Sequence, residues 1–211
     1  MERGGKYQLM GESSQAKEIK EGTNMEAMEP KEETNRLGGI DIVWRRLSID
    51  NIDSLANVAN EIHPGLPESN EVFAERIKLF PEGCFALMKL VQGKTDELCG
   101  YAISHPIRHR QPPDLDSFLK EIAPDADQYY IHDLAILPSE RGRGLAQDCI
   151  KKLLAVAERF PTSCPVSVYG TSPFWSKYSF RMPESVDSHL EKRLQRYGND
   201  AIYLERTNPS S

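Results

Sequence analysis

The stretch that most constrains the fold of this chain runs from Tyr129 to Phe160. Residues 129–137 are rich in aromatic and β-branched side chains, which favours a strand, and Pro138 follows directly. Apolar residues then recur at helical spacing from Leu145 onward and predict an amphipathic helix. The sequence therefore predicts a strand, a tight turn and a long helix in direct succession.

The turn between this strand and this helix has the composition of an anion site. Gly142 and Gly144 have no Cβ, so a ligand can approach their main chain closely. The first turn of a helix leaves N–H groups unpaired and carries roughly half a positive charge, and Arg141 and Arg143 add full charges beside it. A pyrophosphate suits such a site. The alternative is a turn whose arginines only face solvent.

The spacing Arg141-x-x-Gly144-x-Ala146 resembles the signature with which the GNAT (GCN5-related N-acetyltransferase) superfamily binds the pyrophosphate of acetyl-coenzyme A. The glycine spacing fits neither the dinucleotide-binding nor the Walker pattern. Three further stretches are similar to elements of the same family: Gly100-Tyr101, Leu134-Ala135-Ile136 and Pro173 to Phe180. Within the superfamily, residues 130–136 are most similar to arylalkylamine (serotonin-type) N-acetyltransferases.

The order of predicted elements agrees with this resemblance. We expect an α/β (α+β) chain with a mixed, mostly antiparallel central sheet flanked by helices, which the resemblance identifies as the acyl-CoA N-acyltransferase fold. The predicted strands are 40–45, 84–91, 98–104, 129–137, 166–169 and 201–205; the predicted helices are 52–62, 69–80, 116–122, 145–160 and 173–180.

Transfer of an acetyl group from a thioester to an amine needs a base, and His132 is the best candidate. Imidazole has a reference pKa near 6.5, which suits proton uptake close to neutral pH. In a regular strand Tyr130 and His132 share one face while Asp133 points away. The serotonin-type enzymes carry two histidines on this face, and here Tyr130 takes the first position. A hydrogen-bonded structural role is the alternative for His132.

The group that protonates the leaving thiolate is less obvious. Trp175 stands where the family usually has tyrosine, and an indole cannot act as an acid. Tyr178 follows one helical turn later and is our candidate, with Tyr169 or departure of the free thiolate as alternatives. The resemblance implies that main-chain groups of the strand and the turn hold the coenzyme. The expected contacts are Leu134, Ala135, Ile136, Arg141, Gly142, Arg143, Gly144, Leu145, Ala146 and Trp175.

The acceptor should bind between the loop 63–67 and the segment 105–127, because long loops in compact domains are usually functional or disordered. Four basic side chains lie there, and they either face solvent or recognise an acidic or polar acceptor: His63, Arg108, His109 and Arg110.

Composition excludes several other classes of protein. The net charge of -6 argues against sequence-independent binding of nucleic acid, and the apolar runs are too short to span a membrane. The four cysteines have no metal-binding or disulfide spacing, so we expect buried free thiols and no metal. Residues 1–38 should form a disordered tail, 39–207 the acetyltransferase domain and 208–211 a short C-terminal tail.

These observations lead to one main functional hypothesis. We expect an N-acetyltransferase that moves the acetyl group of acetyl-coenzyme A to a small-molecule amine, of the arylalkylamine type on the closer resemblance. We also expect a monomer or weak homodimer in the cytoplasm, with a nuclear location left open. The alternatives are a protein or peptide N-acetyltransferase and a non-enzymatic acyl-coenzyme A-binding regulator.

Overall fold

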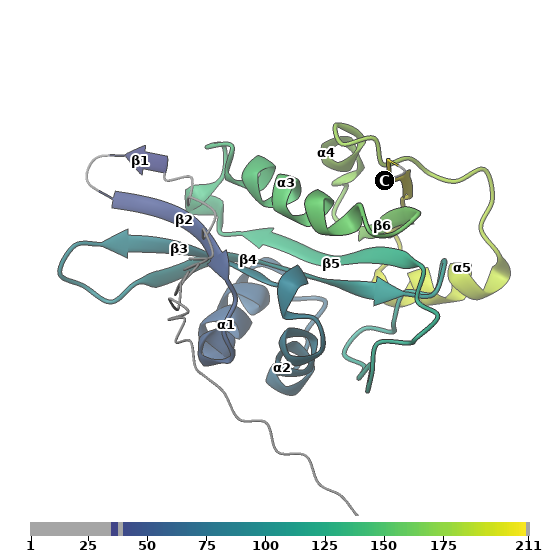
Figure 1. Ribbon diagram of the computed structural model, residues 1–211, viewed down its shortest axis with the longest axis horizontal. Helices are drawn as coiled ribbons and strands as arrows, with labels where there is room; N and C mark the ends of the chain where they lie inside the picture. Colours follow the sequence, from purple (N-terminus) through teal and green to yellow (C-terminus); the bar gives the residue numbers. More distant parts are fainter. Residues whose placement is uncertain (1–34, 38–39, 210–211) are drawn as a thin grey trace, which may run out of the picture. The chain divides into compact units, whose positions relative to one another are not determined.

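A computed structural model describes residues 35–37 and 40–209 (Figure 1). The predicted N-terminal tail lies outside the described residues up to position 34. Strand β1 begins at Asn35, which is earlier than the expected start of ordered structure near Ile40, and it pairs with β2. Residues 210 and 211 of the predicted C-terminal tail also lie outside the described part.

The described chain forms an eight-stranded sheet in which β1 to β7 lie in chain order and β8 pairs with β6. All neighbours are antiparallel except β5 and β6, which run parallel. This confirms the predicted mixed, mostly antiparallel sheet. The strands are β1 (Asn35–Leu37), β2 (Ile40–Arg46), β3 (Phe85–Val91), β4 (Glu97–Ile107), β5 (Gln128–Ile136), β6 (Thr162–Ser167), β7 (Ile202–Tyr203) and β8 (Arg206–Thr207).

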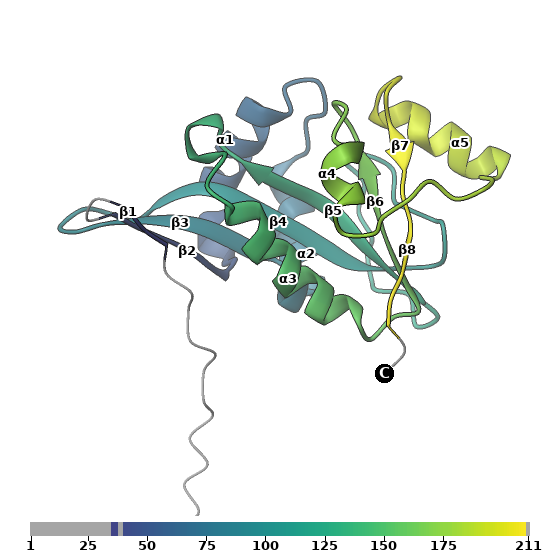
Figure 2. The same ribbon diagram turned by 90° about the horizontal axis from the view of Figure 1, so that it is seen from above.

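Helices cover both faces of the sheet, α1 and α2 on one and α3 and α4 on the other (Figures 1 and 2). Each helix buries an apolar face, such as Leu55 and Val58 of α1 and Cys149 and Leu153 of α3. The helices are α1 (Ile52–Ile62), α2 (Asn70–Leu79), α3 (Leu145–Ala157), α4 (Ser172–Ser176) and α5 (Ser188–Leu194), with 3-10 turns at Ile49–Asn51, Pro81–Gly83, Pro138–Glu140 and Gln195–Tyr197.

Two irregularities of β5 prepare the site. The pairing of β4 with β5 passes from Ile103↔Asp133 to Ser104↔Ile131, so His132 is the additional residue of a β-bulge. On its other side β5 pairs with β6 only over residues 128–131. Residues 132–136 therefore have no strand partner on the β6 side within the described chain, and this edge of β5 is open.

The segment 108–127 contains no helix, contrary to the prediction for 116–122. Asp116 and Lys120 adopt left-handed φ values of 51° and 67°. The Glu75 carboxylate accepts the N–H groups of Leu119 and Lys120, and Arg76 donates to the carbonyl of Ser117. Side chains of α2 thus satisfy the main-chain groups that a helix would have used.

Smaller differences concern the C-terminal third. Strand β6 begins at Thr162 and ends at Ser167, where a strand over 166–169 was expected. Of the predicted last strand over 201–205 only β7 forms, and β8, which follows it, was not predicted. Helix α5 was not predicted, although Asp187 caps it by accepting the N–H groups of His189 and Leu190. All four cysteines are buried and free, as expected. No helix in the described ranges is long and apolar enough to cross a bilayer.

Candidate active site

The glycine turn before α3 has the geometry of an anion cradle. Gly142 and Gly144 have φ values of 80° and 78°, and no atom lies within 4 Å of the position that a Cβ would take in either. In the described structure the main-chain N–H groups of residues 142–146 have no acceptor, because the first bond of this region runs from Gln147 N to Gly144 O. Successive unpaired N–H groups at a helix N-terminus fit a pyrophosphate.

The two arginines of this turn are held by the protein itself. Arg143 Nη1 donates to Glu140 Oε2 at 2.7 Å, and Lys89 Nζ lies 3.3 Å from the other oxygen of this buried carboxylate. Arg141 Nε donates to the Ile136 carbonyl at 2.8 Å. Arg141 therefore braces the turn against the end of β5, and Arg143 braces it against the 3-10 turn Pro138–Glu140. The predicted contact of both arginines with the coenzyme stays a prediction.

The predicted main-chain contacts lie along the open edge of β5. Leu134, Ala135 and Ile136 pair with β4 on one side, and their opposite side faces the gap beside β6. Gly100 permits this close pairing, since a Cβ there would lie 2.7 Å from the Ala135 carbonyl oxygen. Leu145 is buried at the start of α3, where its carbonyl accepts the Trp44 indole N–H at 2.8 Å, and Ala146 is partly buried next to it.

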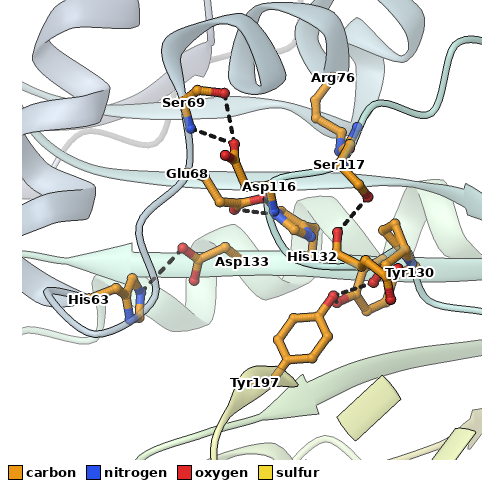
Figure 3. Close-up of polar contacts among 12 residues, drawn as sticks. His63, Glu68, Ser69, Arg76, Asp116, Ser117, Tyr130, His132, Asp133 and Tyr197 are labelled. Carbon is orange, nitrogen blue, oxygen red and sulfur yellow. Dashed lines mark hydrogen bonds and ion pairs between the residues drawn. The ribbon is translucent and has the colours of Figure 1, made fainter. Parts of the chain in front are cut away.

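His132 forms a buried pair with Glu68, which lies in the loop between α1 and α2 (Figure 3). His132 Nε2 lies 2.7 Å from Glu68 Oε2, and the two side chains are 2 % and 7 % exposed. An ionised carboxylate only accepts hydrogen bonds, so Nε2 carries the proton and Nδ1 of the neutral ring carries the lone pair. Nδ1 is buried and has no hydrogen-bond partner among the described residues.

The charge on Glu68 is stabilised inside the protein. Burial alone would raise the pKa of this carboxyl group, but His132 and then Arg76 outweigh burial, and the pKa lies below its usual value. Glu68 is therefore anionic at neutral pH and suited to stabilise a protonated His132 ring.

Asp133 lies on the same side of the sheet as His132, which corrects the expectation that it points away. The bulge at His132 breaks the strict alternation of β5, so two successive side chains face α1 and α2. Tyr101 OH donates to Asp133 Oδ2 at 2.5 Å. His63 Nε2 lies 3.2 Å from the same oxygen, as Figure 3 shows.

Tyr130 is fully buried beside this pair. Its ring lies edge-on to His132 with centroids 5.6 Å apart, and its hydroxyl donates to Tyr197 OH at 3.4 Å. Burial raises the pKa of Tyr130 well above its usual value, so the hydroxyl stays protonated. These contacts show a side chain that packs against the base; its predicted catalytic role stays a prediction.

The candidates for the acid are widely separated. Trp175 is buried between Phe174 and Phe180, and Tyr178 packs edge-on to Phe174 at 5.5 Å. The structure does not bring Tyr178 together with His132. Tyr169, which follows β6, instead stacks on His63 with ring centroids 5.5 Å apart. It therefore lies with His63 and Asp133, next to His132.

Sequence reasoning missed Glu68 and placed Asp133 on the wrong side of the sheet. Glu68 lies 64 positions before His132, and only the fold brings the α1–α2 loop over β5. Its position next to the predicted acceptor loop 63–67 was the available signal. The four predicted basic side chains are divided: His63 pairs with Asp133 in the site, whereas Arg108 pairs with Asp125, and His109 and Arg110 pair with Glu205.

Two surface hollows, one between the first turns of α1 and α2 and one beside α5, lie away from His132. In the part of the chain that the structure describes, no group of three or more His, Cys, Asp or Glu side chains is arranged to hold a metal ion.

The open strand edge, the N–H cradle and the buried His132–Glu68 pair define a coenzyme A-dependent acyltransferase. Residues 50–169 match the model of the Acetyltransferase (GNAT) family, and the chain belongs to this family. It uses acyl groups carried by coenzyme A. No curated protein matches the chain in sequence.

Solved structures share the fold at low sequence identity. One is the GphF GNAT-like decarboxylase in complex with isobutyryl-CoA, with 15% identity and a TM-score of 0.57 over 79% of this chain and 99% of that chain. Another is the NatC complex bound to Gag peptide and CoA, with 18% identity and a TM-score of 0.56 over 81% and 99%. A third is N-acetylglutamate synthase from Neisseria gonorrhoeae complexed with coenzyme A and N-acetyl-glutamate, with 16% identity and a TM-score of 0.55 over 80% and 35%. These likenesses concern the fold.

Proposed function

We propose that this protein transfers the acetyl group of acetyl-coenzyme A to the primary amine of a small molecule, with His132 as the base. One observation carries the proposal: the buried Nδ1 of His132 has a free lone pair, while Nε2 is held at 2.7 Å from Glu68. An imidazole fixed in one tautomer by a carboxylate is prepared to take up a proton.

In the proposed reaction the neutral amine attacks the thioester carbonyl. A nitrogen–carbon bond forms, the carbon–sulfur bond breaks, and the excess proton of the amine passes to His132 Nδ1, directly or through water. Glu68 stabilises the imidazolium that results. Main-chain N–H groups on the open edge at residues 134–136 would stabilise the negative charge on the carbonyl oxygen, an effect that is typically worth about a hundred- to a thousandfold in rate.

We assign protonation of the leaving thiolate to Tyr169 in place of Tyr178. Tyr169 stacks on His63 beside Asp133, whereas Tyr178 packs against Phe174. Burial and the nearby Asp200 and Asp133 raise the pKa of Tyr169, which keeps its hydroxyl protonated at neutral pH. A protonated phenol can donate its hydrogen to the departing sulfur.

An arylalkylamine is the acceptor we propose. The resemblance of residues 130–136 to the serotonin-type enzymes supports this, and so does the stacked His63–Tyr169 pair, which offers flat rings next to the carboxylates. An aromatic acceptor would pack on such rings.

The test is release of free coenzyme A thiol from acetyl-coenzyme A with a panel of acceptors: phenylethylamine, tryptamine, polyamines, amino acids, amino sugars and basic peptides. We expect the highest kcat/KM for the arylalkylamines, with the N-acetylated amine identified by mass spectrometry. Turnover on peptides alone would contradict the small-molecule acceptor, and release without any acetylated amine would contradict transfer to nitrogen.

A further inference from the structure

Two carboxylates on the side of α2, Glu75 on the helix and Glu68 in the loop before it, are fully engaged. Glu75 accepts the N–H groups of Leu119 and Lys120 at 2.7 and 2.8 Å, and it pairs with Arg76 Nη1 at 3.0 Å. Glu68 accepts His132 Nε2 at 2.7 Å on one oxygen and the Asp116 N–H at 3.3 Å on the other. Neither has an oxygen left for a ligand.

Asp133 differs from both. Its two contacts, with Tyr101 OH and with His63, involve Oδ2 alone, and Oδ1 has no hydrogen-bond or ion-pair partner in the described structure. The side chain is 20% exposed, compared with 7% for Glu68. Burial opposes its charge, but His63 and Tyr101 outweigh burial, so the pKa of Asp133 lies below its usual value. The site therefore offers one anionic, partly accessible carboxylate oxygen.

His63 is the cationic partner of this carboxylate, and it is loosely held. It follows the last residue of α1, and its Nε2 lies 3.2 Å from Asp133 Oδ2. Neither ring nitrogen makes a well-directed hydrogen bond within the described residues. Burial lowers the pKa of His63, but Asp133 and Glu68 outweigh burial and the repulsion from Arg141, so the pKa is raised. Near neutral pH a part of the molecules therefore carries a proton on His63.

We propose that Asp133 binds the ammonium group of the acceptor, and that His63 is the counter-ion which the acceptor displaces. The inference rests on the proposed function and names its substrate class: a primary amine that is cationic in solution. With both histidines neutral, four carboxylates (Glu68, Glu75, Asp116 and Asp133) face two guanidinium groups (Arg76 and Arg141), which leaves two net negative charges and favours such a cation.

The position of Asp133 links binding to the chemistry. It is adjacent to His132 and, because of the bulge, on the same side of the sheet. During turnover an ammonium group on Asp133 can pass one proton to His132 Nδ1, which must release it to water before it can accept the further proton that attack on the thioester sets free. In the binding step itself, a proton leaves when the ammonium group replaces a protonated His63. The charged or titratable groups that face His63 are Asp133, Glu68, Arg141 and Tyr169.

The experiment is titration calorimetry of phenylethylamine into the full chain saturated with coenzyme A, at about pH 6.5, in two buffers of different ionisation enthalpy. We expect the wild type to release a fraction of a proton for each amine bound. His63→Gln should bind the amine at least as tightly without this release. Asp133→Asn, which keeps an acceptor for Tyr101, should bind about tenfold to a hundredfold more weakly.

Two controls separate binding of the charge from structural damage. Asp96→Asn changes an exposed carboxylate that pairs with Arg45 on the β3–β4 turn and should leave the affinity unchanged. Uncharged 2-phenylethanol should bind wild type and Asp133→Asn equally. Unchanged phenylethylamine affinity in Asp133→Asn, proton release that persists in His63→Gln, or no phenylethylamine binding by the wild type would overturn the proposal. Because no turnover is required, binding as expected without any thiol release would instead count against the proposed function.

Discussion

His132 is the additional residue of a β-bulge, and this single irregularity places it and Asp133 on the side of the sheet that α1 and α2 cover. The α1–α2 loop then supplies a partner to each, Glu68 to His132 and His63 to Asp133. Two histidine–carboxylate pairs thus lie at adjacent positions of one strand. The His132–Glu68 pair is nearly closed to solvent, and the His63–Asp133 pair is partly exposed.

At this scale Glu68→Gln gives the most specific prediction. The amide can still accept the hydrogen bond from His132 Nε2, but it carries no charge to stabilise the imidazolium. A hydrogen bond to a charged group is worth about 1.5–3 kcal/mol, so kcat should fall about tenfold to a hundredfold.

The measurement is steady-state kinetics with acetyl-coenzyme A and the best acceptor of the panel. Glu71→Gln is the control, because this exposed carboxylate lies in the first turn of α2. An unchanged kcat in Glu68→Gln would show that the His132–Glu68 pair fixes the α1–α2 loop and does not stabilise the imidazolium.

His132, Tyr130 and the glycine turn were predicted because each belongs to a local pattern of the sequence, and their roles in the reaction stay predictions. It was not sufficient for Asp133, because strict strand alternation fails at a bulge that no local signal marks. Glu68 was out of reach for a different reason: its contact with His132 depends on how a loop between two helices packs on a distant strand.

Among the elements, the turn before α3 combines a left-handed main chain with unpaired N–H groups. Gly144→Asp should abolish coenzyme A binding, because a carboxylate there repels the pyrophosphate. A left-handed φ costs a non-glycine residue about 1–2 kcal/mol. A control variant must therefore separate this backbone strain from the repulsion of the pyrophosphate.

Gly93 supplies that control. It lies in the β3–β4 turn with φ 76°, close to the 78° of Gly144, and a Cβ at either position meets no atom within 4 Å. In calorimetry Gly93→Asp should bind coenzyme A normally while Gly144→Asp does not. Equal affinities in the two variants would remove the turn from the coenzyme site.

The conformation of the segment 108–127, which packs against α2, depends on the carboxylate of Glu75. Glu75 holds the N–H groups of Leu119 and Lys120 and compensates Arg76, whose side chain is fully buried. Glu75→Ala removes the direct ion pair of this guanidinium and leaves it only the more distant charge of Glu68, and we expect the free energy of unfolding to fall by about 3 kcal/mol.

Denaturant unfolding measures this loss, and Glu71→Ala on the same helix should change stability by less than about 1 kcal/mol. A similar small loss in Glu75→Ala would contradict the role of the carboxylate.

These contacts also explain why the helix predicted over 116–122 does not form. The residues of this stretch favour a helix only weakly, and side chains of α2 bind their main chain instead.

For the molecule as a whole, several buried carboxylates carry stabilised charges. Glu68, Asp133 and Glu205 all have pKa values below their usual ones, since their partners outweigh the effect of burial. A lowered pKa in the folded state means that the unfolded chain binds more protons at acidic pH. The stability from these groups is present above the usual values of 4.5 and 3.8 and is lost as pH falls through the lowered ones.

We therefore expect the free energy of unfolding to fall steadily below about pH 5. Glu205→Gln should be less stable than the wild type at pH 7 and should show a shallower fall, because Arg110 and Tyr203 lose an anionic partner. Denaturant titrations at a series of pH values give both quantities. Parallel curves for the two proteins would contradict this source of acid sensitivity.

The central claim is that His132 accepts the proton of the attacking amine, and the pH dependence of kcat in His132→Gln tests it most directly. Glutamine can still donate a hydrogen bond to Glu68 but cannot take up a proton, and His189→Gln is the control on the exposed face of α5. We expect this variant to have a kcat lowered by about 10²–10⁴-fold, a changed pH profile and an unchanged affinity for coenzyme A. A variant with the rate and pH profile of the wild type would contradict the claim.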